Sequence, residues 1–435
     1  MSAFDLSLLP RSATVDAAGR CHVAGVALDG LAERFGTPLY VYDEGELRAR
    51  CREYRAAFGG PVAYAGKAFL CGAMARLVAD EGLGIDVATG GELHVALHAG
   101  FPPSRITFHG NNKSDEELRR AFEAGVGRIV ADSFDELDRV ERLAGRSGRA
   151  PAVMIRVTPG VAVDTHEYIA TGVEDSKFGF GLANGEALAA VRRVVAHHAV
   201  PFAGIHCHIG SQIDRLDAFT RAVEKMVGFV HAVESETGAL VDEVNVGGGL
   251  GVRYLPEDSP PSIARYGAVV HEAFEKAIAA AGVRSRPRVG CEPGRSIAAP
   301  AGLTLYRVGT IKHIPSVRTY VAVDGGMSDN LRPVTYGARY EAFLPARAAA
   351  ERPLVATIAG KHCEQGDLLV RDARLPADVA NGDVLAIPVT GAYAYAMASN
   401  YNKVPRPAVV FVRDGTARVV VRRETDDDLV RLDLA

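Results

Sequence analysis

The stretch Pro61-Val-Ala-Tyr-Ala-Gly-Lys-Ala-Phe69 introduces the pattern that decides the fold. Its first four residues form a short apolar run, which predicts a buried strand. Lys67 stands at the end of that run, and a lysine amine in a partly dry site loses its proton readily and can form a Schiff base with an aldehyde. Taken alone, the position is better explained by an ordinary lysine whose ammonium reaches water. The segments around it change that interpretation.

The same unit repeats along the chain: a short apolar strand, a polar or glycine-containing turn, and an amphipathic helix. Helices are predicted at residues 71–81, 92–98 and 115–124, the last with Ser114 as its N-cap. Eight strands are predicted, at residues 61–64, 84–87, 105–108, 128–131, 152–157, 202–205, 243–246 and 288–290.

Eight strand–helix units over about 240 residues are the number and size expected of a (β/α)8 barrel. A doubly wound sheet is the alternative arrangement. We favour the barrel because the count stops at eight and nearly every predicted strand ends in polar or glycine residues. In a barrel, chemistry gathers at the C-terminal rim of all the strands, whereas a doubly wound sheet gathers it at one crevice.

The segments that flank the barrel pattern consist of strand-like runs with little helix between them. We therefore predict an α/β protein with three regions: N-terminal strands at residues 1–45, a TIM-like barrel at 46–295, and a β-rich domain at 296–435 that the N-terminal strands complete. The strand-like runs lie at 21–24, 38–42, 303–308, 319–323, 353–358, 384–389, 409–412 and 417–422.

Composition excludes several classes of function. Hydrophobic residues make up 48% and charged residues 23% of the 435, as in an ordinary soluble enzyme. A net charge of -4 without a polybasic patch gives no reason to expect a nucleic-acid partner, and no apolar run is long enough for a membrane span. The six cysteines form no C-x-x-C pair, so we expect neither a metal site nor a redox dithiol. With no signal peptide in view, a cytoplasmic location is expected.

Two glycine-rich segments follow the seventh and eighth predicted strands, Gly247-Gly-Gly249 and Gly294-Arg295. Glycines let backbone N–H groups approach an anion, and barrels frequently hold phosphate at the loops after these two strands. A glycine triplet alone usually marks only a turn. Together with Lys67, however, the pattern suggests pyridoxal phosphate, which needs both a Schiff-base lysine and a phosphate cradle.

The same cofactor needs a group that stacks on its ring and a partner for its pyridine nitrogen. His206 and His208 follow the sixth strand, and one of them can stack, although each can equally be a hydrogen-bonded core histidine. Glu292 is the candidate carboxylate, which would keep the nitrogen protonated and strengthen the electron sink. The alternative for Glu292 is an ordinary salt bridge, for example with Arg156.

A series of motifs runs in order along nearly the whole chain and resembles the diaminopimelate decarboxylases, bacterial enzymes of the fold-type III, alanine-racemase-like group that uses pyridoxal phosphate. The motifs are Ala65-Gly-Lys-Ala68, Phe108-His-Gly-Asn-Asn-Lys-Ser114, His206-Cys-His-Ile-Gly-Ser-Gln212, Gly247-Gly-Gly249, Cys291-Glu-Pro-Gly-Arg295, Cys363-Glu-Gln-Gly-Asp367, and Gly391-Ala-Tyr393 with Ser399-Asn-Tyr-Asn402. The resemblance implies a barrel with a C-terminal β domain, as the strand pattern does, and a homodimer with shared active sites.

The resemblance also implies roles for individual residues. Lys67 would hold the cofactor covalently, His208 would stack on its ring and Glu292 would pair with its pyridine nitrogen. Cys363 would enter from the partner subunit as the proton donor, unless it is a buried structural thiol. The other cofactor residues would be Asp86 near the Schiff base, with Ser211, Gly248, Gly294, Arg295 and Tyr393 around the phosphate.

The implied reaction converts meso-2,6-diaminopimelate to L-lysine and carbon dioxide, the last step of lysine biosynthesis. The far end of this substrate carries a carboxylate and an ammonium group. Arg295, Arg332 and Tyr336 would bind the carboxylate and Glu364 the ammonium, with Tyr393 beside them. A decarboxylase that forms diamines from ornithine or lysine has no distal carboxylate, so Arg332 favours diaminopimelate.

Three related functions compete with this one. A decarboxylase for another amino acid, including one from specialised metabolism, would share the fold, and two small departures from the family pattern, Gln365 and Ala394-Tyr-Ala396, lie where they can tune specificity. An amino-acid racemase of this fold places arginine at the pyridine nitrogen, which Glu292 argues against. A non-catalytic pyridoxal phosphate carrier would lack the β domain that contains Cys363 and Tyr393.

Overall fold

The computed structural model describes residues 3–147, 150–161 and 176–434. The chain forms two compact units, which we call the barrel unit and the β-rich unit. The barrel unit consists of Arg50–Gly251 and Pro260–Ser296, and the β-rich unit of Met1–Ala49, Val252–Ser259 and Ile297–Ala435. Within the described residues, no helix is long and apolar enough to cross a membrane.

The barrel unit confirms the predicted (β/α)8 barrel. Its parallel strands pair in the order β13-β12-β11-β9-β8-β7-β6-β5, with the short β10 (Phe180–Gly181) added beside β9. The two ends of this order meet, because Val62 and Cys291 form a parallel bridge and the Ala63 amide donates to the Cys291 carbonyl at 3.0 Å. The strands are β5 (Ala63–Ala65), β6 (Gly84–Val87), β7 (Ile106–Phe108), β8 (Arg128–Ala131), β9 (Ala152–Thr158), β11 (Phe202–His206), β12 (Glu243–Asn245) and β13 (Arg288–Gly290).

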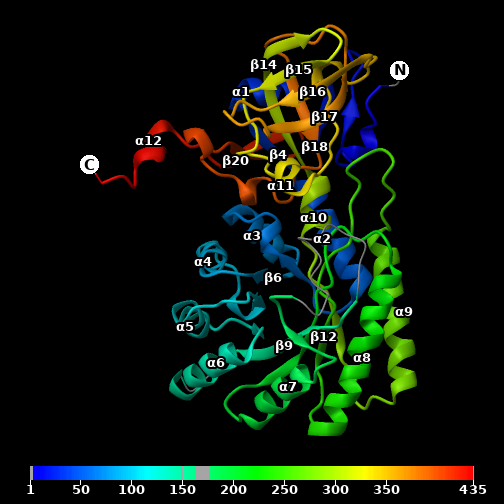
Figure 1. The fold of residues 1–435 in the computed structure, drawn as a ribbon, viewed down its shortest axis with the longest axis vertical. Helices are drawn as coiled ribbons and strands as arrows, with labels where there is room; N and C mark the ends of the chain where they lie inside the picture. Colours follow the sequence, from blue (N-terminus) through cyan, green and yellow to red (C-terminus); the bar gives the residue numbers. More distant parts are fainter. Residues whose placement is uncertain (1–2, 148–149, 162–175, 435) are drawn as a thin grey trace. The chain divides into compact units, whose positions relative to one another are not determined.

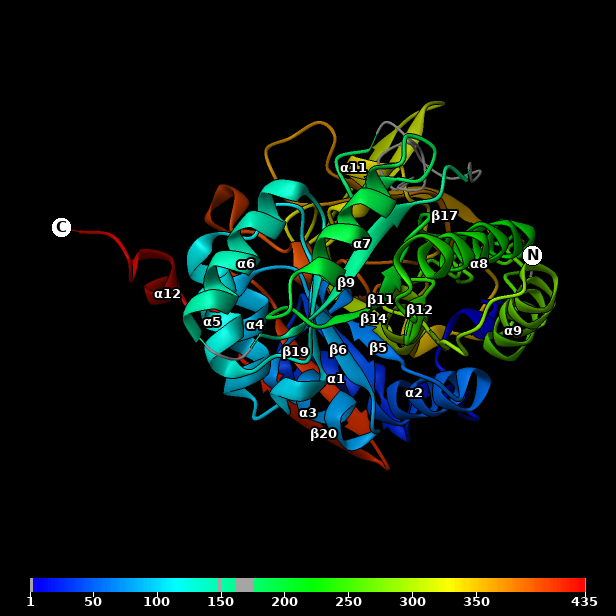
Figure 2. The ribbon, with the colours of Figure 1, turned by 90° about the horizontal axis from the view of Figure 1, so that it is seen from below.

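Helices lie around the outside of these strands (Figure 2). Helix α5 has the bounds predicted for it, and its start shows why: the Ser114 hydroxyl accepts the Glu117 amide at 3.2 Å while the Glu117 carboxylate accepts the Ser114 amide at 2.9 Å. The helices are α2 (Glu44–Phe58), α3 (Gly72–Asp80), α4 (Gly90–His98), α5 (Asp115–Ala124), α6 (Phe134–Ser147), α7 (Glu186–Ala196), α8 (Asp217–Thr237), α9 (Ile263–Ala281) and α10 (Arg295–Ala298).

The β-rich unit is built on a sheet in the order β17-β16-β15-β14-β4-β19-β20, with β18 paired to β14 (Figure 1). The N-terminal strand β4 lies between β14 and β19, which confirms that N-terminal sequence completes the β domain. A separate small sheet contains β1, β2 and β3. The strands are β1 (Thr14–Val15), β2 (Cys21–Val23), β3 (Val26–Ala27), β4 (Leu39–Asp43), β14 (Gly302–Ile314), β15 (Arg318–Val323), β16 (Leu354–Ala359), β17 (Leu368–Leu375), β18 (Val384–Pro388), β19 (Ala408–Arg413) and β20 (Thr416–Val421).

The elements of the β-rich unit that were not predicted include helix α1 (Leu28–Phe35) and strand β17. In β17 the adjacent residues Arg371 and Asp372 are both exposed, and Asp372 has a φ of +54°. The pairing of β17 with β16 shifts register at this place. Such a bulge breaks the alternation of apolar and polar residues on which strand prediction depends.

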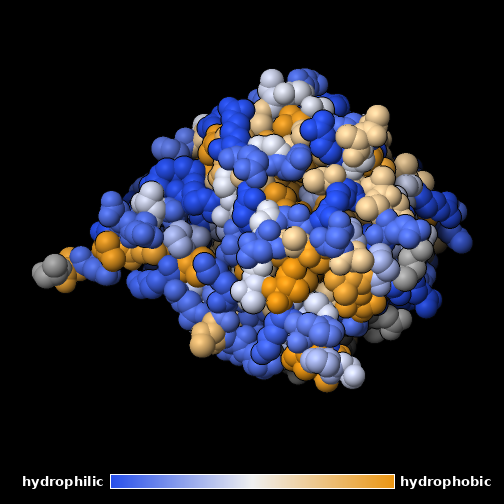
Figure 3. Space-filling model, turned by 90° about the horizontal axis from the view of Figure 1, so that it is seen from above, coloured by the Kyte–Doolittle hydropathy of each residue, from blue (hydrophilic) through white to orange (hydrophobic). Residues whose placement is uncertain are grey.

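The chain ends in helix α12 (Asp426–Val430) and a short segment that projects from the β-rich unit in Figure 1. Hydrophobic residues are visible on this projecting end in Figure 3. Leu432 and Leu434 are 83% and 100% exposed. Apolar side chains in such a position offer a contact surface to another molecule.

Candidate active site

Every strand of the barrel ends in a polar or ionisable side chain. Seven of these eight side chains are buried, and one, Lys67, is exposed. Paired positions on neighbouring parallel strands share a face, so the pairing of Arg156 with His206 and of His206 with Asn245 places these three in one row. The side chains, in strand order, are Lys67, Asp86, His109, Asp132, Arg156, His206, Asn245 and Glu292.

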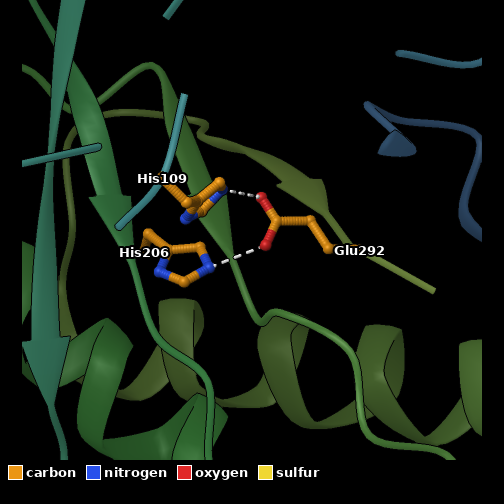
Figure 4. A group of neighbouring side chains, drawn as sticks. All are labelled: His109, His206 and Glu292. Carbon is orange, nitrogen blue, oxygen red and sulfur yellow. Dashed lines mark hydrogen bonds and ion pairs between the residues drawn. The ribbon is translucent and has the colours of Figure 1, made fainter. Parts of the chain in front are cut away.

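Three side chains from three other strand ends bind the Glu292 carboxylate. Figure 4 shows two of them, His109 and His206. His109 Nε2 lies 2.9 Å from Glu292 Oε1, and His206 Nε2 lies 2.9 Å from Oε2. Asn245 donates from Nδ2 to Oε1 at 3.2 Å. One nitrogen from each of the two histidines and one oxygen of Glu292 all lie within 4.8 Å of one another, a spacing that metal ligands can also have. The 2.9 Å contacts between nitrogen and oxygen, however, are hydrogen-bond lengths.

The protonation of this group follows from its burial. Burial lowers the pKa of His206 to about 4 and also lowers the pKa of His109, so both imidazoles are neutral near pH 7. A neutral imidazole has one N–H, and we assign it to Nε2 in both rings because that atom faces a carboxylate oxygen. Burial alone would raise the pKa of Glu292, but the two histidines hold that pKa well below its ordinary value. Glu292 is therefore an anion.

The alternative considered for Glu292, a salt bridge with Arg156, is wrong, because the contacts of Glu292 are with His109 and His206. Arg156 instead lies 3.9 Å from Asp132, measured from Nε to Oδ1, and its guanidinium stacks 4.3 Å from the Phe178 ring centre. His206, which the sequence offered as a stacking group, is committed to Glu292. The stacking of His208 on the cofactor ring stays a prediction.

Lys67 lies in the 3-10 turn η2 (Gly66–Ala68) after β5, and its side chain is exposed. The partly dry environment expected for it is therefore not found, because the strand ends two residues earlier than the lysine. Asp86 is paired with Ala65 in the ladder. Burial and the negative charge of Glu292 raise the Asp86 pKa well above its ordinary value, and the Lys67 charge opposes the rise. Lys67 and Asp86 thus interact electrostatically, and their roles toward the cofactor stay predictions.

The glycine-rich segments lie beside His208 and Glu292. Gly248 donates its amide to His208 Nδ1 at 3.2 Å, and Arg295 donates to the Ser211 hydroxyl from Nε at 3.1 Å and from Nη2 at 2.8 Å. A Cβ at Gly248 would lie 2.3 Å from the Glu292 carbonyl oxygen. Only glycine permits this approach of two strand ends. A guanidinium, a hydroxyl and close-packed glycines beside an anionic carboxylate are groups that fit pyridoxal phosphate.

The β-rich unit contains the other predicted site residues. Arg332 is 6% exposed and begins helix α11 (Arg332–Tyr336). Its Nη1 donates to the Tyr340 hydroxyl at 2.5 Å, and its guanidinium carbon lies 4.8 Å from the Tyr254 ring centre. Among the described residues, no carboxylate forms an ion pair with Arg332. Tyr336 lies at the end of the same helix and is half-buried.

The segment that begins with Cys363 follows a buried histidine. His362 Nε2 lies 2.8 Å from the Ser328 hydroxyl, and Asp367 accepts the His362 amide at 2.9 Å. Cys363 is exposed and donates its amide to Asn402 at 3.0 Å, so the alternative of a buried structural thiol is wrong. Glu364 is exposed as well. Tyr393 is half-buried and has a φ of +63°.

Comparison with known proteins identifies the family. Residues 44–299 match the model of the pyridoxal-dependent decarboxylase, pyridoxal binding domain. The chain is 49% identical to diaminopimelate decarboxylase of Mycobacterium tuberculosis, over 98% of this chain and 97% of that protein, and 47% identical to that of Bacillus subtilis, over 96% and 95%. This chain belongs to the diaminopimelate decarboxylases. It is therefore a carboxy-lyase that depends on pyridoxal phosphate.

A solved structure agrees with this membership. Diaminopimelate decarboxylase from M. jannaschii in complex with L-lysine superposes with a TM-score of 0.91 at 34% identity, and the match covers 98% of each chain. The chain is thus similar over its whole length to a diaminopimelate decarboxylase of known structure.

Three side chains at the strand ends were given no role from the sequence: His109, Asn245 and Asp132. His109 and Asp132 each stand directly after a predicted strand, which is the position of the residues that were assigned. Reading one polar residue from every strand end would have found them. Their contacts with Glu292 and Arg156 could not be read from the sequence, because strand register and barrel closure decide them.

Proposed function

We propose that this chain removes one carboxylate from meso-2,6-diaminopimelate as carbon dioxide and leaves L-lysine, the last step of lysine biosynthesis. The observation that carries the choice of substrate is the buried Arg332. A buried cation without an acidic partner is costly unless an anion pairs with it. We assign that anion to the distal carboxylate of the substrate, which arginine binds through two parallel hydrogen bonds.

The chemistry centres on the barrel rim. The bond between the α-carbon and its carboxylate breaks, the bonding electron pair stays on the α-carbon, and a proton replaces the departing carbon dioxide. Pyridoxal phosphate supplies the electron sink that holds this pair when it is bound. Lys67 would hold the cofactor and exchange it for the substrate amine. Cys363 would deliver the proton to the α-carbon.

The anionic state of Glu292 suits the pyridine nitrogen. A carboxylate that accepts three hydrogen bonds and keeps its charge favours a protonated nitrogen, which increases electron withdrawal. An arginine there would do the opposite, which supports decarboxylation over racemisation. His208 would stack on the ring, and Asp86 would lie near the reactive nitrogen. Ser211, Gly248, Gly294, Arg295 and Tyr393 would surround the phosphate.

The remaining substrate contacts would come from Arg295, Tyr336, Tyr393 and Glu364, of which Glu364 would bind the distal ammonium. The alternative, decarboxylation of ornithine, lysine or a specialised amino acid with a cationic end, would leave Arg332 without an anion. It is therefore not favoured.

Replacement of Arg332 tests the assignment. We expect Arg332→Ala to raise the KM for meso-diaminopimelate about a hundredfold, since a buried charged pair loses one partner. Arg332→Lys keeps the charge but not the planar fork, so it should recover only part of the loss. Release of carbon dioxide from diaminopimelate, lysine and ornithine would be measured side by side. An unchanged KM for diaminopimelate in Arg332→Ala would remove the argument.

We also propose a homodimer with shared active sites, in which each subunit supplies Cys363 to its partner. The exposure of Cys363 and of the apolar C-terminal residues Leu432 and Leu434 supports subunit contact. A cytoplasmic location is proposed with it. All six cysteines are free thiols, as a reducing compartment would keep them.

A further inference from the structure

Two tyrosines in the β-rich unit surround Arg332. We propose that Tyr254 and Tyr340 are positioning residues that select substrates with a distal carboxylate, because they fix the Arg332 guanidinium without neutralising it. The inference rests on the function proposed for Arg332 and adds the residues that make it effective.

The contacts define a tyrosine cage formed by Tyr254 and Tyr340. The Arg332 guanidinium carbon lies 4.8 Å from the Tyr254 ring centre and 5.7 Å from that of Tyr340, both within cation–π range. The two rings meet edge to face, with centres 5.4 Å apart and planes at 87°. Tyr340 is 3% and Tyr254 7% exposed. The cage therefore removes Arg332 from water on two sides.

The chemistry of the cage explains why tyrosine serves better than an acidic residue. An aspartate or glutamate would also stabilise the buried arginine, but it would compete with the substrate carboxylate for the guanidinium. Aromatic rings attract the cation through their electron-rich faces and carry no net charge. The Tyr340 hydroxyl accepts one of the five N–H bonds of the guanidinium, and no described carboxylate forms an ion pair with Arg332. The positive charge stays available to a ligand.

The cage also reduces the entropy cost of binding. A free arginine side chain loses much rotamer freedom when it binds a ligand. Arg332 is already held by one hydrogen bond and two rings. A guanidinium group that is already held in its binding orientation discriminates between ligands with and without a carboxylate more strongly than a mobile guanidinium does.

The segment that supplies Tyr254 is itself fixed to the β-rich unit. Asp258 accepts the backbone amides of Tyr254 at 2.9 Å and Leu255 at 3.0 Å. Arg253 pairs with Asp5 at 3.4 Å, and Glu257 pairs with Arg339 at 3.5 Å. The segment Val252–Ser259 interrupts the barrel sequence yet belongs to the β-rich unit. Tyr254 lies beside Arg332 because this segment belongs to the β-rich unit.

L-lysine and cadaverine form the ligand pair that tests the cage. They differ only in the carboxylate, which L-lysine keeps from the distal end of diaminopimelate. Dissociation constants of both would be measured on the holoenzyme by calorimetry, together with the KM for meso-diaminopimelate. The variants are Tyr254→Leu, which removes the nearer ring, and Tyr340→Phe, which keeps a ring and removes only the hydroxyl.

We expect Tyr254→Leu to weaken L-lysine binding about tenfold and Tyr340→Phe about fivefold, with cadaverine binding unchanged. Tyr266→Phe removes a buried hydroxyl in α9 of the barrel unit and should change neither ligand. The unchanged cadaverine affinity shows that a variant is folded and its cofactor site intact.

Three results would overturn the proposal or its basis. Equal weakening of L-lysine and cadaverine would mean that the tyrosines are only structural. Unchanged binding of both ligands would mean that Arg332 needs no cage. Arg332→Ala distinguishes the role proposed for Arg332 from the role proposed for the tyrosines. If Arg332→Ala leaves L-lysine binding unchanged, the function proposed for Arg332 is wrong. If Arg332→Ala weakens L-lysine binding but the tyrosine variants do not, only the cage is rejected.

Discussion

His206 Nε2 lies 2.9 Å from Glu292 Oε2, and the two residues are 86 positions apart in the chain. The imidazole is neutral and the carboxylate is an anion, because burial lowers the His206 pKa to about 4 while the histidine contacts keep the Glu292 pKa low. This arrangement fixes the orientation of Glu292 without cancelling its charge. It also makes the stability of the barrel unit depend on pH.

Replacing His206 should reduce that dependence. Above pH 6.5 the imidazole is neutral in the folded and unfolded states. As the pH falls from 6.5 to about 4, the unfolded chain binds a proton that the folded protein does not bind, so the free energy of unfolding decreases. The contribution is about 3 kcal/mol over this window. His206→Gln, whose amide can still donate to Glu292, should lose less stability between pH 7 and 4.5, as measured by urea unfolding. Parallel curves for the two proteins would contradict the prediction.

Substitution of Gly248 should impair cofactor binding. An added methyl group meets the Glu292 carbonyl oxygen at 2.3 Å, so the backbone of one strand end must move. We expect Gly248→Ala to weaken pyridoxal phosphate binding about tenfold or more, measured by absorbance titration of the cofactor-free protein. Gly228→Ala is the matched control, because Gly228 lies within α8 with no atom within 4 Å of an added Cβ. If both variants bind the cofactor equally well, the close approach of Gly248 to the Glu292 carbonyl oxygen is not required for cofactor binding.

The buried ion pair between Lys113 and Glu136 should be costly to break on one side. Lys113 Nζ lies 2.7 Å from Glu136 Oε1, and both side chains are 1% exposed. Lys113 also donates to the carbonyls of Gly110 and Val130. We expect Lys113→Met to lower the free energy of unfolding by about 3–5 kcal/mol, because an unpaired charge remains buried. The double variant Lys113→Met with Glu136→Leu should recover part of this loss. If the double variant recovers no stability, the loss comes from the carbonyls of Gly110 and Val130, which no longer receive a hydrogen bond from Lys113.

Mixing two variants tests the proposed sharing of active sites between subunits. Lys67→Ala lacks the lysine proposed to hold the cofactor, and Cys363→Ala lacks the proposed proton donor, so we expect each variant alone to be inactive. If each site combines Lys67 of one subunit with Cys363 of the other, a mixed dimer contains one intact site. Random exchange of subunits should then restore about a quarter of wild-type activity. Activity that stays at the level of the separate variants after exchange, confirmed by native mass spectrometry, would place both residues on the same subunit.

Much of this protein is determined by local sequence. The alternation of apolar strands, glycine-containing turns and amphipathic helices predicts the barrel, because each unit follows from short-range periodicity. The bounds of β6, β8, β13 and α5 match the predictions for residues 84–87, 128–131, 288–290 and 115–124. Lys67, Glu292 and Arg332 were predicted as site residues because of the motifs and strand ends at which they stand.

The tertiary structure decided which of these residues meet. His109 and Glu292 are 183 residues apart, and their contact depends on closure of the barrel between β13 and β5. The exposure of Lys67 depends on where β5 ends, and the tyrosine cage depends on the excursion of Val252–Ser259 to the β-rich unit. Such contacts arise from strand register and long-range packing, for which spacing along the chain carries no signal.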